Sequence, residues 1–396
     1  MKISVEKRDA VRLAVLPPLA LYVHIPWCVR KCPYCDFNSH ERGGILPEAA
    51  YVEKLVSDLE GLLPSVWGRR IISVFIGGGT PSLFSPDSID ALLAAVRARL
   101  TLEPGAEITL EANPGTVEAG RFRGFREAGV NRISVGVQSF DDRMLGALGR
   151  IHSAAEARRA VELALEAVGN VNLDLMYGLP GQDVSGVIHD LEKALACGVP
   201  HLSAYQLTIE PNTVFFSHPP PLPEHDLCAD MQMKVEDFLA GNGFQHYETS
   251  AFARPGHRCR HNLNYWEFGD YLGIGAGAHG KISFPDRITR HERIKQPGVF
   301  LSSPDTLSME KAVPPLEIPF EFMLNALRLV EGFPVALFAE RTGLALSTVE
   351  KSLKEAERQG LLERDWQRIR PSRRGRHFLN DLLQPFLDDQ QPPGRS

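Results

Sequence analysis

Three cysteines lie within eight positions of one another in the segment CVRKCPYC, at Cys28, Cys32 and Cys35. Thiolates bind soft metals, so this trio could ligate zinc, a 4Fe–4S cluster, or no metal at all. A structural zinc site needs four ligands, and His24 and His40 are the nearest candidates for the fourth. A 4Fe–4S cubane held by three cysteines leaves one iron open to a substrate or cofactor. The spacing therefore predicts a metal site, and an open iron would explain why the segment supplies three thiols and not four.

Further residues with chemical potential follow the next predicted strands. They are Gly78, Gly79 and Thr80 after the second strand, Glu111 at the end of the third, Gln138 at the end of the fourth, and Asp174 in the fifth. Glycines let backbone N–H groups approach a ligand closely, carboxylates accept hydrogen bonds from ammonium or hydroxyl groups, and Arg150 can pair with a carboxylate. Each feature also has an ordinary explanation, since a glycine run often forms a tight turn and an aspartate often bonds nearby backbone.

The elements that must position these residues alternate along the chain. Short β-branched runs such as IISVFIGG and VNLDLMYGLP are separated by helix-period segments such as DSIDALLAAVRARL, and about six such units precede residue 210. This alternation predicts an α/β fold with a parallel sheet, two units short of a closed (β/α)8 barrel. In such folds the carboxyl ends of the strands form one rim. We therefore expect the cysteines and the polar residues to converge there.

The rest of the chain divides into further regions. We expect an N-terminal extension over residues 1–19, a barrel over 20–215, a connecting α/β region over 216–311, and a C-terminal domain over 312–396. The connecting region begins with the proline-rich SHPPPLPEHD and continues with a helix, a strand and a glycine-rich loop. The C-terminal domain has the helix, turn, helix and β-like tail that predict a winged helix-turn-helix.

Composition limits the partners and the compartment. The chain has 396 residues and a formal net charge of −6, which argues against a nucleic-acid partner. A DNA-binding regulator remains the rival suggested by the winged helix, whose basic residues are Arg368, Arg370, Arg373, Arg374 and Arg376. Six cysteines are too few for a secreted disulfide scaffold, and no apolar run predicts a signal peptide or a membrane span. We expect a cytoplasmic protein.

The cysteine spacing resembles the Cys-x3-Cys-x2-Cys signature of the radical S-adenosylmethionine (SAM) superfamily. That resemblance implies a partial (β/α)6, TIM-like barrel with the cysteine loop after its first strand. It also implies a 4Fe–4S cluster whose fourth iron is chelated by SAM, and cleavage of SAM to a radical when the cluster is reduced.

Further motifs narrow the resemblance to one family. The segments YVHIPWC, GGGTPS, EANP, GVQSF, GRIH, DLMYGLP and HNLNYW are similar to the anaerobic coproporphyrinogen III oxidase group, and within it to the HemW branch of haem chaperones. By that likeness Tyr22, Gly78 and Glu111 contact the cluster-bound SAM and Tyr34 packs beside the cluster. The positions that surround a second SAM in the oxidases are matched by Gly79, Thr80, Gln138, Arg150 and Asp174.

Two features separate a chaperone from an oxidase. The oxidases carry a further cysteine two residues after the third, where this chain has Phe37. In HNLNYW, His261 could ligate haem iron while Tyr265 and Trp266 stack on the macrocycle, although the same residues could simply pack on the barrel. We expect a haem chaperone, with oxygen-independent coproporphyrinogen III oxidase as the alternative. The expected partners are haem and haem-accepting client proteins, membrane respiratory enzymes among them; a homodimer and a place at the membrane periphery are left open.

Overall fold

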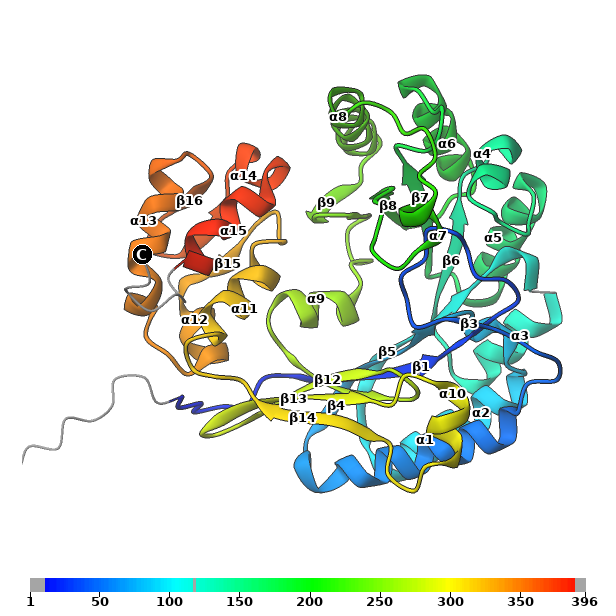
Figure 1. Ribbon diagram of the computed structural model, residues 1–396, viewed down its shortest axis with the longest axis horizontal. Helices are drawn as coiled ribbons and strands as arrows, with labels where there is room; N and C mark the ends of the chain where they lie inside the picture. Colours follow the sequence, from blue (N-terminus) through cyan, green and yellow to red (C-terminus); the bar gives the residue numbers. More distant parts are fainter. Residues whose placement is uncertain (1–10, 117–118, 389–396) are drawn as a thin grey trace, which may run out of the picture.

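The computed structural model describes residues 11–116 and 119–388, which form a central sheet of twelve strands (Figure 1). Six neighbouring strands of this sheet are parallel and follow one another in chain order. They are β1 (Leu19–Ile25), β4 (Arg70–Gly78), β5 (Thr101–Ala112), β6 (Arg132–Gln138), β7 (Val171–Tyr177) and β8 (His201–Gln206). Parallel neighbours joined by helices are successive βα units. The predicted partial (β/α)6 barrel is confirmed.

Helices connect these strands and cover the apolar side of the sheet. They are α1 (Glu48–Leu62), α2 (Pro86–Arg99), α3 (Ala119–Ala128), α5 (Ala154–Val168) and α6 (Val184–Ala196), with shorter α4 (Asp142–Ala147) and the 3-10 turns η1 (Leu63–Ser65), η2 (Pro81–Leu83) and η3 (Pro114–Thr116). Local signals set their ends. Helix α5 starts at a capping box between Ser153 and Glu156 and stops at Gly169, whose φ of 69° is left-handed.

The two faces of the sheet differ in polarity. In β5, Ile108 and Leu110 join the main hydrophobic core, whereas Glu107 and Glu111 alternate with them and point to the barrel interior. The apolar face is stabilised by burial against the helices, and the polar face is left to line the barrel. The fold thus places carboxylates inside the barrel as a direct result of the period-two pattern.

Residues 216–311 extend the same sheet at both edges. Next to β1 lie β11 (Asp270–Ile274), which is parallel to it, and then antiparallel β12 (His279–Phe284), β13 (Arg287–Arg293) and β14 (Leu307–Ala312). Next to β8 lie antiparallel β10 (Ala251–Ala253) and β9 (Gln245–Glu248). The same stretch and its approach contain α7 (Val214–Ser217), α8 (His225–Gly241) and α10 (Pro297–Ser302). These strands pair the backbone groups that the barrel edges would otherwise expose.

The segment HNLNYW forms part of a short helix, α9 (Arg260–Trp266), so the expectation of a loop here is wrong. Figure 1 shows α9 on the opposite side of the sheet from α1 and α2. The Glu107 carboxylate accepts hydrogen bonds from the backbone N–H groups of Arg260 (3.2 Å) and His261 (3.1 Å). These are N–H groups of a first helical turn, which have no partner within a helix. A residue some 150 positions away therefore fixes where α9 begins.

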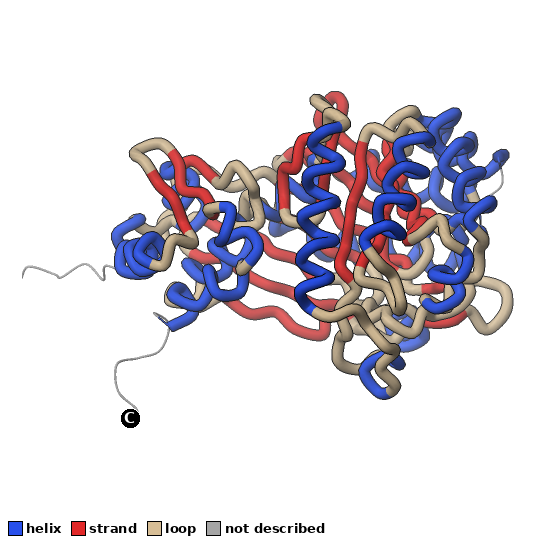
Figure 2. Tube along the Cα trace, turned by 90° about the horizontal axis from the view of Figure 1, so that it is seen from above, coloured by secondary structure: helices blue, strands red, loops and turns tan. Residues whose placement is uncertain are grey.

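The C-terminal part is a winged helix with its own apolar core, located at one end of the molecule (Figure 2). It comprises α11 (Ile318–Ala326), β15 (Phe333–Pro334), α12 (Val335–Thr342), η4 (Leu346–Val349), α13 (Glu350–Arg358), β16 (Leu362–Arg364), β17 (Arg368–Pro371), α14 (Arg373–His377) and α15 (Leu379–Asp388). Val11 and Leu13, from the predicted N-terminal extension, are buried in this core. In the described part of the chain, no helix is both long and apolar enough to cross a bilayer.

Candidate functional site

The cysteine loop leaves the barrel directly after β1, and the two ends of the loop pair with each other. The two-residue strands β2 (Trp27–Cys28) and β3 (His40–Glu41) pair across the loop. Their pairing is reinforced by hydrogen bonds from the His40 N–H to the Pro26 carbonyl (2.7 Å) and from the Arg42 N–H to the Cys28 carbonyl (2.9 Å). The loop therefore leaves the carboxyl rim of the barrel and returns to it, and its three thiols are half-buried.

Each of the three sulfurs has its own polar neighbour. Thr80 donates its hydroxyl to the Cys28 sulfur (3.4 Å) and Arg150 donates Nη1 to the Cys32 sulfur (3.5 Å). The Cys35 sulfur lies 3.6 Å from the Ser39 hydroxyl. Burial raises the pKa of the Cys28 thiol, whereas the Thr80 hydrogen bond lowers it. Such donors stabilise the thiolate form that metals bind.

These thiols suit a cluster better than a single ion. Among the described residues, no group of three or more histidine, cysteine, aspartate or glutamate side chains is arranged to hold one metal ion. Structural zinc needs its ligands to meet around one centre, whereas each cysteine of a 4Fe–4S cluster binds a different iron. Three soft donors on one loop, each with a polar neighbour, fit a 4Fe–4S cluster.

The glycine run at the end of β4 packs against the cysteine loop. The N–H groups of Gly79 and Thr80 donate to the carbonyls of Ile25 and Trp27, both at 2.8 Å. A Cβ on Gly79 would lie 2.6 Å from the Trp27 carbonyl oxygen, and Gly78 has a φ of 119°. The close approach of two chain segments thus explains these glycines without a ligand, and they bring Thr80 within reach of Cys28.

Two carboxyl groups lie together inside the barrel beside this run. Glu111 accepts a hydrogen bond from the Gly78 N–H (3.0 Å). Burial and the neighbouring Asp174 charge raise the pKa of Glu111 to about 8. Asp174 accepts from Ser134 (3.0 Å) and Asn172 (2.7 Å), and burial raises its pKa as well. Neighbouring carboxyl groups with raised pKa values are typical of functional sites.

Arg150 joins the barrel rim to the cysteine loop. Its Nη2 donates to the Gly136 carbonyl (2.7 Å) while Nη1 reaches Cys32, and its buried Nε has no hydrogen-bond partner within the described chain. Gln138, two residues after Gly136, has a left-handed φ of 71°. Burial raises the pKa of the Tyr34 hydroxyl, and the nearby Arg150 guanidinium lowers it. Arg150 thus connects the end of β6 to the Cys32 side of the cysteine loop.

The remaining predicted residues divide between this rim and the barrel interior. Tyr22 is half-buried in β1, its hydroxyl bonds the His24 ring (2.9 Å), and it lies close enough to Glu111 for that carboxylate to raise the pKa of Tyr22 further. His261 lies elsewhere, on α9. Both of its ring nitrogens are engaged at 3.0 Å, Nδ1 by Ser73 and Nε2 by Tyr265, and burial lowers its pKa to about 3. Haem ligation by His261 would require one of these bonds to break.

A polar network in the barrel interior was not anticipated. His201 bonds both Asn172 (2.6 Å) and the Tyr247 hydroxyl (2.8 Å), which in turn accepts from the Cys259 N–H (3.2 Å). Asn172 also bonds Asp174, and the Cys259 thiol donates to Glu107. The network therefore connects the pair of Glu111 and Asp174 to the start of α9. A signal for it does exist in the sequence, because polar and apolar residues alternate in VNLDL and HLSAY.

Beside α9, a cavity of about 240 Å³ opens between the barrel sheet and the C-terminal domain. Its walls are Tyr265, Trp266, Phe268, Gly269, Tyr271, Lys281, Arg290 and Asn325. The indole Nε1 of Trp266 is buried without a hydrogen-bond partner in the described chain. The cavity combines aromatic faces with two cations that are already paired, Lys281 with Asp270 and Arg290 with Glu321, and its aromatic faces suit a planar ligand.

Known proteins resemble the chain along nearly its whole length. The family model for the radical SAM superfamily matches residues 22–194, and that for the HemN C-terminal domain matches residues 313–378. Heme chaperone HemW of Escherichia coli is 50% identical over 374 residues, which cover 94% of this chain and 99% of that protein. Heme chaperone HemW of Haemophilus influenzae is 49% identical over 381 residues, covering 95% and 99%.

A solved structure shares the fold. The coproporphyrinogen III oxidase HemN from Escherichia coli, which is a radical SAM enzyme, superimposes with a TM-score of 0.79 over 94% of this chain and 90% of that one. Its sequence identity is 22%, so the likeness speaks for the architecture and not for the reaction. The near full-length identity to the two chaperones is the closer relation. The chain belongs to the radical SAM superfamily and, within it, to the HemW family.

Proposed function

We propose that this chain is a haem chaperone of the radical SAM type, which holds a 4Fe–4S cluster and SAM and passes haem to client proteins. The observation that carries the proposal is a loop of three thiols, each with a polar neighbour, at the mouth of a barrel whose full-length relatives are named heme chaperones. Cys28, Cys32 and Cys35 would hold the cluster. When bound, that group would supply a reducible centre with one open iron.

The residues around the loop would hold the cluster's charge and orient SAM. Thr80 and Arg150 contact cluster cysteines directly, so their first role in this proposal is to stabilise thiolates. Glu111 and Asp174 would accept hydrogen bonds from amino or hydroxyl groups of SAM. Tyr22, Gly78 and Tyr34 would shape that site. A second SAM near Gly79 and Gln138 stays a prediction.

Haem would be held at the aromatic cavity beside α9. Tyr265 and Trp266 present ring surface to that cavity. Its two cations are already paired, Lys281 with Asp270 and Arg290 with Glu321, so the aromatic rings carry this assignment. At about 240 Å³ the cavity is smaller than a typical small-molecule site, so a planar macrocycle would enter it only in part. His261 supports Tyr265 through its hydrogen bond, and as an iron ligand it stays a prediction.

Phe37 weighs against oxidative decarboxylation. It occupies the position of the additional oxidase cysteine, and its side chain is 63% exposed at the barrel mouth. A phenyl ring neither ligates metal nor transfers protons. The second candidate, coproporphyrinogen III oxidase, is supported by the shared fold alone.

The test is anaerobic reconstitution with iron and sulfide, followed by titration with haem and SAM and by transfer to an apo haem protein. We expect the visible absorption of a cluster, a saturable haem band and haem transfer. Cys32→Ser should abolish the cluster band, whereas Cys197→Ser should retain it because Cys197 lies at the end of α6, outside the loop. Tyr265→Ala and Trp266→Ala should weaken the haem band without changing the cluster.

Three outcomes would contradict the proposal. Equal loss of the cluster in the Cys197 variant would remove the cluster assignment. Absence of haem binding would remove the chaperone. Release of carbon dioxide from coproporphyrinogen III at a catalytic rate would establish the oxidase. The proposal extends to delivery of haem to respiratory enzymes at the membrane and to a cytoplasmic homodimer, which co-sedimentation with client-bearing vesicles and light scattering would test.

A further inference from the structure

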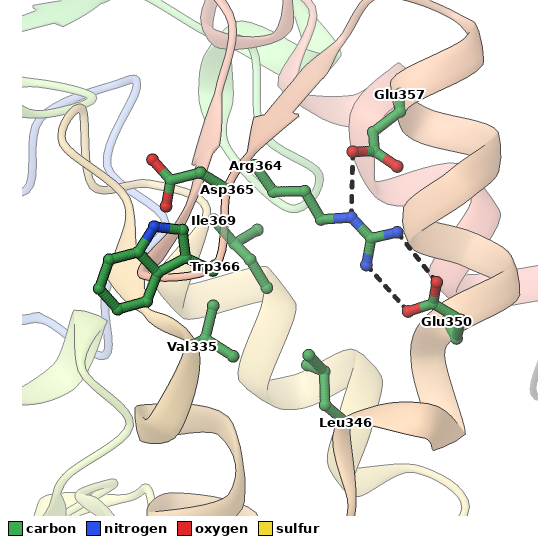
Figure 3. A pocket seen from close by; sticks show the side chains of 8 residues that line it. All are labelled: Val335, Leu346, Glu350, Glu357, Arg364, Asp365, Trp366 and Ile369. Atoms are coloured by element: carbon green, nitrogen blue, oxygen red, sulfur yellow. Dashed lines mark hydrogen bonds and ion pairs between the residues drawn. The ribbon is translucent and has the colours of Figure 1, made fainter.

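The C-terminal domain has an opening of its own, but its charged side chains are paired with one another. This opening, of about 400 Å³, lies between α13 and the hairpin of β16 and β17 (Figure 3). There Arg364 donates hydrogen bonds to both Glu350 and Glu357. Paired surface charges of this kind select no ligand. The contacts that the domain makes with the aromatic cavity beside α9 are of a different kind.

Three rings in the wall of that cavity each have a cation over one face, and each cation is paired with a carboxylate. The three sets of carboxylate, cation and ring are Asp270, Lys281 and Phe268; Glu321, Arg290 and Tyr271; and Glu248, Arg328 and Trp266. The distances from cation to ring centroid are 4.1, 5.9 and 4.3 Å. A cation at such a distance is attracted to the face of an aromatic ring. The wall of the cavity is therefore restrained before any ligand enters it.

Arg328 differs from the other two cations in its position. Lys281 and Arg290 line the cavity themselves, whereas Arg328 is not among the lining residues. It follows α11, the helix of the C-terminal domain that lies beside α9 (Figure 1). Its contact with the Trp266 ring is therefore made from outside the cavity, by a different domain from the one that carries the ring.

Both the backbone and the side chain of Arg328 are fixed by the end of β9. The Arg328 carbonyl accepts a hydrogen bond from the Thr249 N–H (3.0 Å), and the Val330 N–H donates to the Tyr247 carbonyl (3.1 Å). Between these two bonds, Nη2 of Arg328 donates to the buried Glu248 carboxylate (3.5 Å). A buried carboxylate needs a cationic partner, so Glu248 keeps the guanidinium in place. That place is over the indole of Trp266.

We infer that Arg328 is a positioning residue for haem, which keeps the Trp266 ring in one orientation so that a planar ligand can stack on it. A side chain that is free to rotate loses conformational freedom when a ligand stacks on it, and this loss weakens binding. The contact with Arg328 restricts the ring in advance. The inference rests on the proposed haem site beside α9, and it adds the C-terminal domain to that site.

The test is titration of the full-length protein with haem, followed by the Soret absorption and by the circular dichroism of the bound haem. Arg328→Met keeps the length of the side chain but removes its charge, and should weaken haem binding by about five-fold or more and change the Soret dichroism. Arg328→Lys keeps a cation near the indole and should bind haem within about two-fold of the wild type. The cluster absorption should be the same in both variants.

Two further variants separate positioning from stability. Arg328→Met leaves the Glu248 carboxylate unpaired, so Glu248→Gln combined with Arg328→Met should show the same weakening without leaving a buried charge alone. The matched control is Arg287→Met. Arg287 lies 4.3 Å from the centroid of the Phe284 ring, and neither residue lines the cavity. Haem affinity should be unchanged in this control.

A double-mutant cycle with Trp266→Ala identifies the route of the effect. Trp266→Ala alone should weaken haem binding, and the addition of Arg328→Met should then have no further effect, because Arg328 acts through the ring. Unchanged affinity in Arg328→Met, equal weakening by Arg328→Met with and without Trp266, or a lysine variant as weak as the methionine variant would overturn the inference and leave the haem site standing. Unchanged affinity in Trp266→Ala would overturn the haem site and the inference together.

Discussion

Replacement of Glu111 by glutamine should make the protein more stable, by an amount that grows with pH. Burial and the Asp174 charge raise the pKa of Glu111 from 4.5 to about 8 in the folded state. A carboxyl whose pKa is raised by folding contributes stability that is complete below its unfolded pKa and is lost as the pH rises toward its folded pKa. The wild-type protein therefore loses stability from about pH 4.5 to about pH 8, and glutamine, which does not ionise, removes that loss.

The size of the effect follows from the shift. Each pH unit within that range corresponds to about 1.4 kcal/mol, so the advantage of Glu111→Gln should increase by about 3 kcal/mol from about pH 5.5 to about pH 7.5. Hydrogen bonding is largely preserved, because the amide oxygen of glutamine can still accept from the Gly78 N–H. Because Glu111 and Asp174 titrate together, the increase stated above for Glu111→Gln is an upper value. The free energy of unfolding, measured by urea denaturation of SAM-free protein at several pH values, checks it.

The matched control is the same substitution at Glu107. This carboxylate is also buried in β5, but it accepts from two backbone N–H groups of α9 and from the Cys259 thiol, and lies 4.0 Å from Arg132. Glu107→Gln should therefore destabilise by about 1–3 kcal/mol, the opposite sign from Glu111→Gln. If Glu111→Gln were less stable than wild type near pH 8, or its advantage did not change with pH, the account of the acid pair would be refuted. If Glu111→Gln is more stable than the wild type but binds SAM poorly, then Glu111 serves SAM binding and lowers the stability of the protein.

Two further substitutions follow from close packing and buried hydrogen bonds. Gly78→Val should destabilise the protein by roughly 1–3 kcal/mol, because a Cβ there would lie 2.6 Å from the His24 ring and the φ is 119°. The control Gly68→Ala, where the φ is 76° but no atom lies within 4 Å of the new Cβ, should destabilise by about 1 kcal/mol. Equal thermal shifts in the two variants would contradict the packing argument. Asn172→Ala should lower the free energy of unfolding by about 2–3 kcal/mol, since it leaves buried partners of the interior network unsatisfied, and a change below about 0.5 kcal/mol would show that the Asp174 environment does not depend on it.

The sequence contains enough local information to predict the barrel. Alternating strand and helix periods are short-range properties, so six βα units could be recognised from IISVFIGG to HLSAYQ and placed in order by the handedness and adjacency of parallel units. The three-thiol motif is also local. Its spacing within eight residues identified the cysteine loop, and the rule that parallel strands end on one rim predicted that Thr80 and Glu111 lie near it.

Contacts between distant parts of the chain could not be predicted in this way. The strands of residues 245–312 add to both edges of the barrel sheet, and nothing in their local pattern distinguishes a new domain from an extension of an existing one. The start of α9 depends on Glu107, and the hydrogen bonds that occupy His261 come from Ser73 on β4 and Tyr265 on α9 itself.

The physical reason for this division is the range of the interactions. Helix and strand periods, caps and motif spacings act within a few residues, so the sequence by itself determined the barrel units, the winged helix and the thiol trio. Protonation and ligand access depend on burial and on charges brought together from separate strands, as the pKa of Glu111 depends on Asp174 sixty-three positions later. Only the tertiary structure decided that Glu111 lies beside a second carboxyl, that His261 is already hydrogen-bonded, and that the strands of residues 245–312 extend the barrel sheet.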